Sequence, residues 1–211
     1  LDILESIRWI AVDHLKKTTP ELQWNRWLGT GGTFVSLRVD QEPFDDVRVR
    51  RALNLAINQQ EIADVFYGGH AELMAYPQHP DFGDYFQPLS EMPEEIQELF
   101  TYNPEKAKQL LAEAGYPNGF EIPFLAYRNR DYAEAMINNL NAVGIKTKFE
   151  YLKYAAFRDK VQDGGSPFNF GTWGSYSIND VSAITSHFQS GGKDDYSKDA
   201  EVINHLKIGD T

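Results

Sequence analysis

Two short stretches of the sequence carry residue types that are well suited to holding a small molecule. The first is YRNRDY at residues 127–132, where Arg128 and Arg130 stand beside Tyr127, just before a predicted helix. A guanidinium binds a carboxylate with two parallel hydrogen bonds, and the start of a helix also favours an anion. The stretch therefore predicts a carboxylate-binding loop. The alternative is a solvated loop of surface Arg–Asp pairs.

The second stretch is GTWGSYSIND at residues 171–180, which follows a predicted strand. Trp173 leaves this strand into a loop and can form a flat wall, while Ser175 and Tyr176, after Gly174, supply hydroxyl groups that orient a ligand. The alternative is a core tryptophan at a strand end. Helical spacing favours core packing for three further rings, which are Tyr151, Tyr154 and Phe157.

Other chemistry is not indicated by the sequence. The five histidines are scattered without a His-x-x-x-His pair, so no metal site and no cofactor are expected. Adjacent acidic pairs such as Asp45–Asp46 point to different faces of a helix or strand and form no obvious acid–base pair. The glycine-rich stretches match neither a phosphate loop nor a dinucleotide fingerprint.

Composition narrows the class of partner. The chain of 211 residues has 31 acidic and 20 basic side chains, a formal net charge of −11. Such an acidic chain repels nucleic acid and an anionic membrane surface, and no stretch is long and apolar enough to span a bilayer. The absence of cysteine excludes disulfides and thiolate chemistry and is compatible with an oxidising compartment.

Apolar spacing and turn residues predict an α/β domain. The first part has a helix over 1–17, strands over 22–28 and 33–39, helices over 47–57 and 58–67, a loop over 70–92 and helices over 93–100 and 103–114. Strand–helix units follow at 120–143, 145–162 and 168–188, and a last helix at 198–207. This alternation predicts a largely parallel or mixed sheet flanked by helices.

Several ordered blocks carry a resemblance to a known family. They are PFDDVRVRRAL at 43–53, YNPEKAKQLLAEAGY at 102–116, GIK at 144–146, Trp173 and YS at 196–197. Together, over roughly residues 34 to 211, they resemble the family 5 extracellular solute-binding proteins of peptide-type ABC importers, such as oligopeptide- and dipeptide-binding proteins.

The resemblance implies the second, C-terminal lobe of a bilobal binding protein with a type II periplasmic-binding-protein-like fold. Residues 41–211 would form this ligand-binding lobe, and residues 1–40 a lead-in helix and strands from the neighbouring lobe. The family implies a monomer in the periplasm or at the cell surface, with an ABC permease as its membrane partner. We expect the strands that end at Tyr127 and Trp173 to open side by side onto one hollow.

The resemblance also implies roles for individual residues. Arg128 or Arg130 matches an arginine that holds a peptide carboxylate, and Trp173 matches one that lines the ligand side-chain pocket. Tyr176 stands where relatives usually carry an aspartate for the peptide amino group. The loss of that aspartate disfavours a ligand with a cationic end group, and a tyrosine in its place suits a neutral, ring-bearing or sugar-like ligand.

The expected function is thus non-catalytic capture of an oligopeptide or peptide-like solute between two lobes. A sugar or opine-like solute bound in the same way is the first alternative. The alternative from another class is a hydrolase that uses loop carboxylates near Trp173.

Overall fold

The computed structural model describes residues 3–5, 7–29, 32–73, 80, 86–162, 166–173, 198–201 and 203–204, with the backbone alone at positions 32, 162 and 170–173. The strands are β1 (Gly32–Leu37), β2 (Glu121–Ala126), β3 (Lys146–Tyr151) and β4 (Phe168–Trp173). The α-helices are α1 (Trp9–Thr18), α2 (Val47–Ala56), α3 (Gln59–Tyr67), α4 (Glu94–Gln97), α5 (Pro104–Glu113), α6 (Arg130–Ala142) and α7 (Tyr154–Gln162). Short 3-10 turns cover Leu89–Glu91 and Glu98–Phe100.

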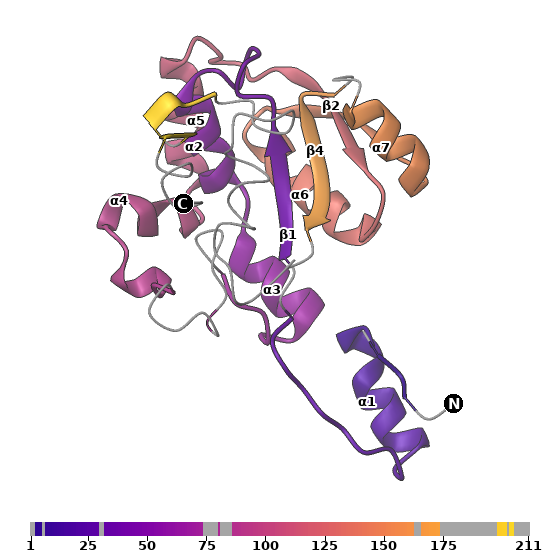
Figure 1. The fold of residues 1–211 in the computed structure, drawn as a ribbon. Helices are drawn as coiled ribbons and strands as arrows, with labels where there is room; N and C mark the ends of the chain where they lie inside the picture. Colours follow the sequence, from indigo (N-terminus) through magenta and orange to yellow (C-terminus); the bar gives the residue numbers. More distant parts are fainter. Residues whose placement is uncertain are drawn as a thin grey trace.

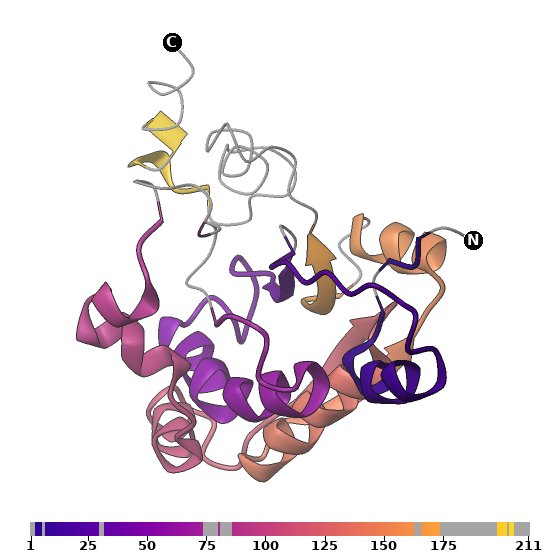
Figure 2. The same cartoon turned by 90° about the horizontal axis from the view of Figure 1, so that it is seen from below.

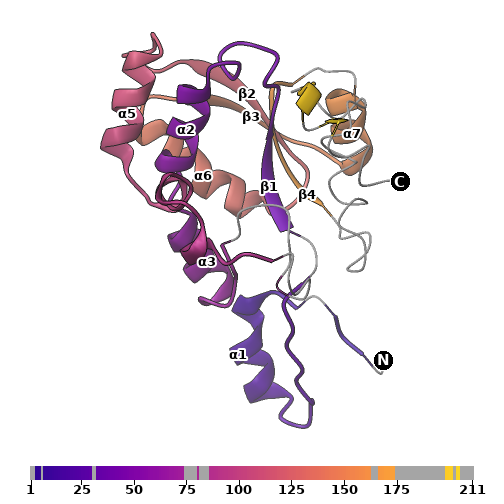
Figure 3. The same cartoon turned by 60° about the vertical axis from the view of Figure 1, so that its left-hand side comes forward.

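The four strands form one mixed sheet in the order β1-β4-β2-β3 (Figure 1). Strands β2, β3 and β4 run parallel, whereas β1 is antiparallel to β4. Helices α2, α5 and α6 cover one face of the sheet and α7 lies on the other side (Figure 3). The expectation of a largely parallel or mixed sheet between helices is therefore confirmed.

The core lies between the sheet and the layer formed by α2, α5 and α6 (Figure 2). Three buried rings mark its centre: Phe168 of β4 packs on Phe124 of β2 at 4.6 Å between ring centroids and on Phe44 at 5.8 Å. Each ring comes from a different part of the chain. Burial of these rings therefore fixes the helical layer against the two central strands.

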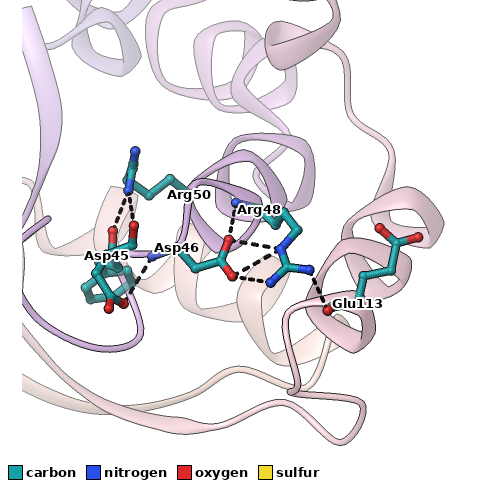
Figure 4. Close-up of polar contacts among 6 residues, drawn as sticks. Asp45, Asp46, Arg48, Arg50 and Glu113 are labelled. Carbon is teal, nitrogen blue, oxygen red and sulfur yellow. Dashed lines mark hydrogen bonds and ion pairs between the residues drawn. The ribbon is translucent and has the colours of Figure 1, made fainter.

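The PFDDVRVRRAL block builds one corner of this layer (Figure 4). Asp46 caps α2 by accepting a hydrogen bond from the backbone N–H of Arg48 at 2.7 Å. The Arg48 guanidinium pairs with Asp46 and also donates to the carbonyl of Glu113, the last residue of α5, at 2.7 Å. Arg50 donates to the Phe44 carbonyl at 2.7 Å. In this structure the block at residues 43–53 therefore caps α2 and holds α2 against the end of α5.

The strand expected over 22–28 is wrong. Residues 22–29 have no regular secondary structure, and they pair with neither β1 nor β3 at the edges of the sheet. A strand needs a neighbour for its backbone groups, and alternating apolar residues cannot supply one. Trp27 of this segment is 66% exposed.

The expected helix over 1–17 is shorter in the structure, because α1 begins at Trp9 and Arg8 is extended. It lies beside α3 and away from the sheet (Figure 1). The helix expected over 180–188 lies outside the described residues. Of the helix expected over 198–207, residues 200, 201, 203 and 204 are helical, and positions 202 and 205–207 lie outside the described residues. The division of the chain at residue 40 stays a prediction, although β1, which precedes that point, is hydrogen-bonded into the sheet.

Candidate functional site

The parallel strands end at one edge of the sheet, and the two predicted stretches follow there. Ala126 of β2 lies level with Phe170 of β4 and with Tyr151 of β3. Strand β4 continues for three residues beyond that level to Trp173, a distance of roughly 10 Å. Neighbouring parallel strands thus bring the ends at Tyr127 and Trp173 to the same edge, which is where ligands bind in open α/β sheets.

Residues 127–132 only partly form the loop that was expected. Helix α6 starts at Arg130, two residues earlier than predicted, so Arg130 and Asp131 stand in its first turn. Asn129 makes this early start possible with a left-handed backbone (φ 50°, ψ 51°), which asparagine tolerates well. Its carbonyl accepts hydrogen bonds from the backbone N–H groups of Tyr132 and Ala133.

A hollow of about 340 Å³, open to solvent, lies at this edge, and we call it the edge hollow. Its lining combines the start of α6, the end of β3 and one residue from the N-terminal segment; the lining residues are Arg8, Asn129, Arg130, Asp131, Glu134 and Tyr151. Its charged side chains are two arginines and two carboxylates.

The four charges of the edge hollow are arranged as two ion pairs. Arg130 Nε donates to Glu134 Oε1 at 2.8 Å across one helical turn. Arg8 pairs with Asp131, and this hydrogen bond is the chief reason why the pKa of Arg8 is raised. Both arginines are about 62% exposed, so solvent screens these pairs and ligand groups can compete for them.

Aromatic rings flank both predicted arginines. The Cζ atom of Arg130 lies 5.7 Å from the ring centroid of Tyr151 and 6.0 Å from that of Phe149. Arg128 lies over Tyr127 at 5.3 Å and does not line the edge hollow. Of the two candidate arginines, the structure therefore brings Arg130 into the hollow.

A second group of rings lies beside this edge. Tyr127 contacts Phe157 at 4.6 Å and Tyr154 at 5.1 Å between centroids. Phe157 is buried, as predicted, whereas Tyr154 is 58% and Tyr151 44% exposed. The core prediction is wrong for these two tyrosines because they stand at the end of β3 and the start of α7, where no described layer covers them.

The other half of the expected site is described only in part. The backbone of Trp173 pairs with Gly32 at the end of β4. Gly174, Ser175 and Tyr176 lie outside the described residues, as do the nearby carboxylates on which the hydrolase alternative depends. The roles of these residues stay predictions.

Three lining residues were missed from the sequence. Glu134 carries a visible signal, since it stands four residues after Arg130 and faces it on a helix. Tyr151 was assigned to the core. Arg8 carries no signal because it lies 123 residues from its partner Asp131.

Among the described residues, no group of three or more histidines and carboxylates is placed to hold a metal ion, and no helix has the length and apolar character of a membrane span.

Comparison with known proteins shows which family the sequence matches. The sequence model described as "Bacterial extracellular solute-binding proteins, family 5 Middle" matches residues 1–195. Heme-binding protein A of Haemophilus influenzae is 34% identical over 156 residues, which is 70% of this chain and 27% of that protein. The glutathione-binding protein GsiB of Escherichia coli K12 is 35% identical over 119 residues, 54% of this chain and 22% of GsiB.

A solved structure shows the same fold. The periplasmic binding protein DppA of Helicobacter pylori, in complex with the peptide STSA, matches with a TM-score of 0.79 at 24% identity, over 95% of this chain and 39% of that one. This confirms the expected fold. The chain spans about a quarter of the length of the curated relatives that it matches.

Proposed function

The chain belongs to the family 5 bacterial extracellular solute-binding proteins, and from that premise we propose that the whole protein captures an oligopeptide or peptide-like solute for an ABC permease. Capture is non-catalytic, by a monomer in the periplasm or at the cell surface. Glutathione is itself a tripeptide, so the glutathione bound by GsiB and the peptide bound by DppA both support this choice.

The observation that carries the proposal is Arg130 in an open hollow at the carboxyl edge of parallel strands. Arg130 is the group that we propose for the ligand carboxylate, with the N-terminus of α6 adding a favourable partial charge. Trp173, Gly174, Ser175 and Tyr176 complete the proposed site on the side of β4, where they hold the ligand side chain. Arg128 and Tyr127 form its outer rim.

Binding proceeds by closure of two lobes around the solute. Water is excluded from the polar groups of the site, and the closed form presents the surface that the permease binds. Arg8 precedes α1, whereas the other lining residues belong to the turn before α6, to α6 itself and to β3. The edge hollow therefore changes shape when α1 and Arg8 move relative to the sheet.

A ring-bearing carboxylate is the second candidate ligand. The exposed rings of Tyr151 and Tyr154 favour it, because they offer flat apolar surfaces. Tyr151 lies beside Arg130, and Tyr154 contacts Tyr127, whose ring Arg128 lies over. The name of heme-binding protein A agrees with this candidate. Opine-like compounds that carry both a ring and a carboxylate belong to the same chemical class.

Mass spectrometry of the molecules released from the purified full-length protein tests the function directly. We expect peptides, and the Arg130→Ala variant should bind the recovered peptide roughly 10-fold or more weakly, since a charge-assisted hydrogen bond is lost. The control is Arg158→Ala, which removes a similarly exposed arginine of α7 that does not line the edge hollow. Consistent recovery of glycans instead of peptides contradicts the proposal, as does unchanged affinity of the Arg130→Ala variant.

A further inference from the structure

The guanidinium of Arg130 is held from two sides. On its own helix, Nε donates to Glu134 Oε1 at 2.8 Å. From the neighbouring strand, the rings of Tyr151 and Phe149 lie 5.7 and 6.0 Å from Cζ. These two residues of β3 are two positions apart, so they point to the same face of the sheet. One anchor is electrostatic and the other is a pair of ring faces.

The anchors leave a defined part of the side chain for a ligand. Arginine has five N–H donors, and the one on Nε is used by Glu134. Within the described part of the chain, no hydrogen bond engages the terminal nitrogens of Arg130. These nitrogens form the end of the guanidinium that receives both oxygens of a carboxylate.

Holding the guanidinium in advance strengthens binding. A free arginine side chain has about 2 kcal/mol of rotamer entropy, which a ligand must otherwise remove when it binds. A helical pair such as Arg130–Glu134 contributes little by itself, because it is exposed and the side chain can rotate away. The rings of Tyr151 and Phe149 restrict that rotation. The ion pair and the ring contacts together therefore order the Arg130 guanidinium more than either contact does alone.

We propose that Tyr151 and Glu134 are positioning residues that hold the terminal nitrogens of Arg130 ready for a carboxylate and so set the preference for carboxylate over neutral ligand ends. The effect on ligand selectivity rests on the proposed function. The ordering of Arg130 itself is a property of the ligand-free protein.

The first test measures selectivity in the full-length protein. Affinities are determined for Ala-Ala-Ala and for its C-terminal amide, and the ratio of the two reports carboxylate preference. We expect Tyr151→Leu and Glu134→Ala each to reduce this ratio roughly two- to five-fold, whereas Tyr151→Phe retains the ring and preserves it. Tyr102→Leu is the control, since Tyr102 is 41% exposed and does not line the edge hollow. An unchanged ratio in Tyr151→Leu and Glu134→Ala overturns the proposal.

The second test needs no ligand. In full-length protein labelled with ¹⁵N-arginine, NMR follows exchange of the Nε proton of Arg130, and Arg158 serves as an internal reference. We expect exchange to be roughly two- to five-fold faster in Tyr151→Leu and Glu134→Ala than in wild type and in Tyr151→Phe. Equal exchange in all four proteins overturns the positioning role. If wild type binds neither tripeptide, the peptide proposal fails and this measurement still decides the role of Tyr151 and Glu134.

Discussion

At the scale of single residues, two glycines show how closely the turns before β2 and β3 approach each other. A methyl group added at Gly119 would lie 2.0 Å from the carbonyl oxygen of Gly144, and Gly119 has a φ of +71°. Just beyond this contact, the Lys146 N–H donates to the Phe120 carbonyl at 2.8 Å. The starting positions of two parallel strands therefore depend on the absence of one side chain.

Replacement of Gly119 tests this contact. We expect Gly119→Ala to lower the free energy of unfolding by about 1–2 kcal/mol for the left-handed backbone and by about 1–3 kcal/mol more for the clash. Gly115→Ala is the matched control, because Gly115 also has a positive φ, +97°, but has no atom within 4 Å of the added methyl group. Denaturant unfolding measures both variants. Equal losses would show that the contact with Gly144 has no cost.

Residue types predicted one residue that lines the edge hollow, Arg130, and the stretch that contains it also contains Asn129 and Asp131. Arg130 was identified because a guanidinium before a helix suits an anion, and the structure places it in the edge hollow. The sequence did not separate it from Arg128, because the distinction depends on which arginine faces β3. Arg8 could not be predicted, since its contact with Asp131 depends on how the whole chain folds.

At the scale of elements, the start of α2 combines a cap with an ion pair. Asp46 accepts the Arg48 backbone N–H, and its hydrogen bond with the Arg48 guanidinium lowers its pKa below the ordinary value of 3.8. A lowered folded-state pKa adds stability above the unfolded pKa, and this contribution is lost as the pH falls through the folded value. The corner between α2 and α5 is therefore weakened by acid.

The Asp46→Asn variant separates the charge from the cap, because asparagine caps a helix as well as aspartate does. We expect it to be less stable than wild type at pH 7, with the difference shrinking toward zero as the pH drops below 3.8. Asp46→Ala removes the cap as well and should remain less stable than Asp46→Asn over the whole range. Unfolding curves from pH 7 to acid provide the measurement. A difference between wild type and Asp46→Asn that does not change with pH contradicts the ion-pair account.

Most elements were predictable because their signals are local. The bounds of β4 match the prediction, and α5 begins directly after its Asn103 cap, whose side chain accepts the Lys106 N–H at 3.0 Å. The strand expected over 22–28 failed because its existence depends on a partner far along the chain. The direction of β1 relative to β4 could not be predicted either, since no residue near 32–37 specifies parallel or antiparallel pairing.

At the scale of the whole molecule, the N-terminal segment is attached by a few contacts at helix ends. Trp9 lies 4.1 Å from the His70 ring between centroids, and Arg26 donates to His70 Nδ1 at 2.6 Å. The third contact is the ion pair of Arg8 with Asp131 in the first turn of α6. The two contacts made by arginines are exposed and Trp9 is only half-buried, so this segment is held less firmly than the core.

A double-mutant cycle of Arg8→Gln and Asp131→Asn tests the ion pair. We expect a coupling of about 0.2–1 kcal/mol in the local stability of α1, because the pair is exposed. Hydrogen exchange of the α1 amides provides the readout, and the coupling should vanish in 1 M salt, where charges are screened within about 3 Å. Lys108→Gln, which breaks a pair inside α5, should leave α1 unchanged. Additive effects of the two substitutions would show that Arg8 and Asp131 act independently.

The pairing of β1 with β4 also has a consequence for biosynthesis. Leu37 pairs with Phe168, so the first strand emerges from the ribosome more than 130 residues before its neighbour exists. At usual translation speeds this interval lasts roughly 7 to 26 seconds. Throughout that time the nascent chain exposes Phe34, Val35 and Leu37 without their final cover, which makes this stretch a natural binding target for chaperones that act during synthesis.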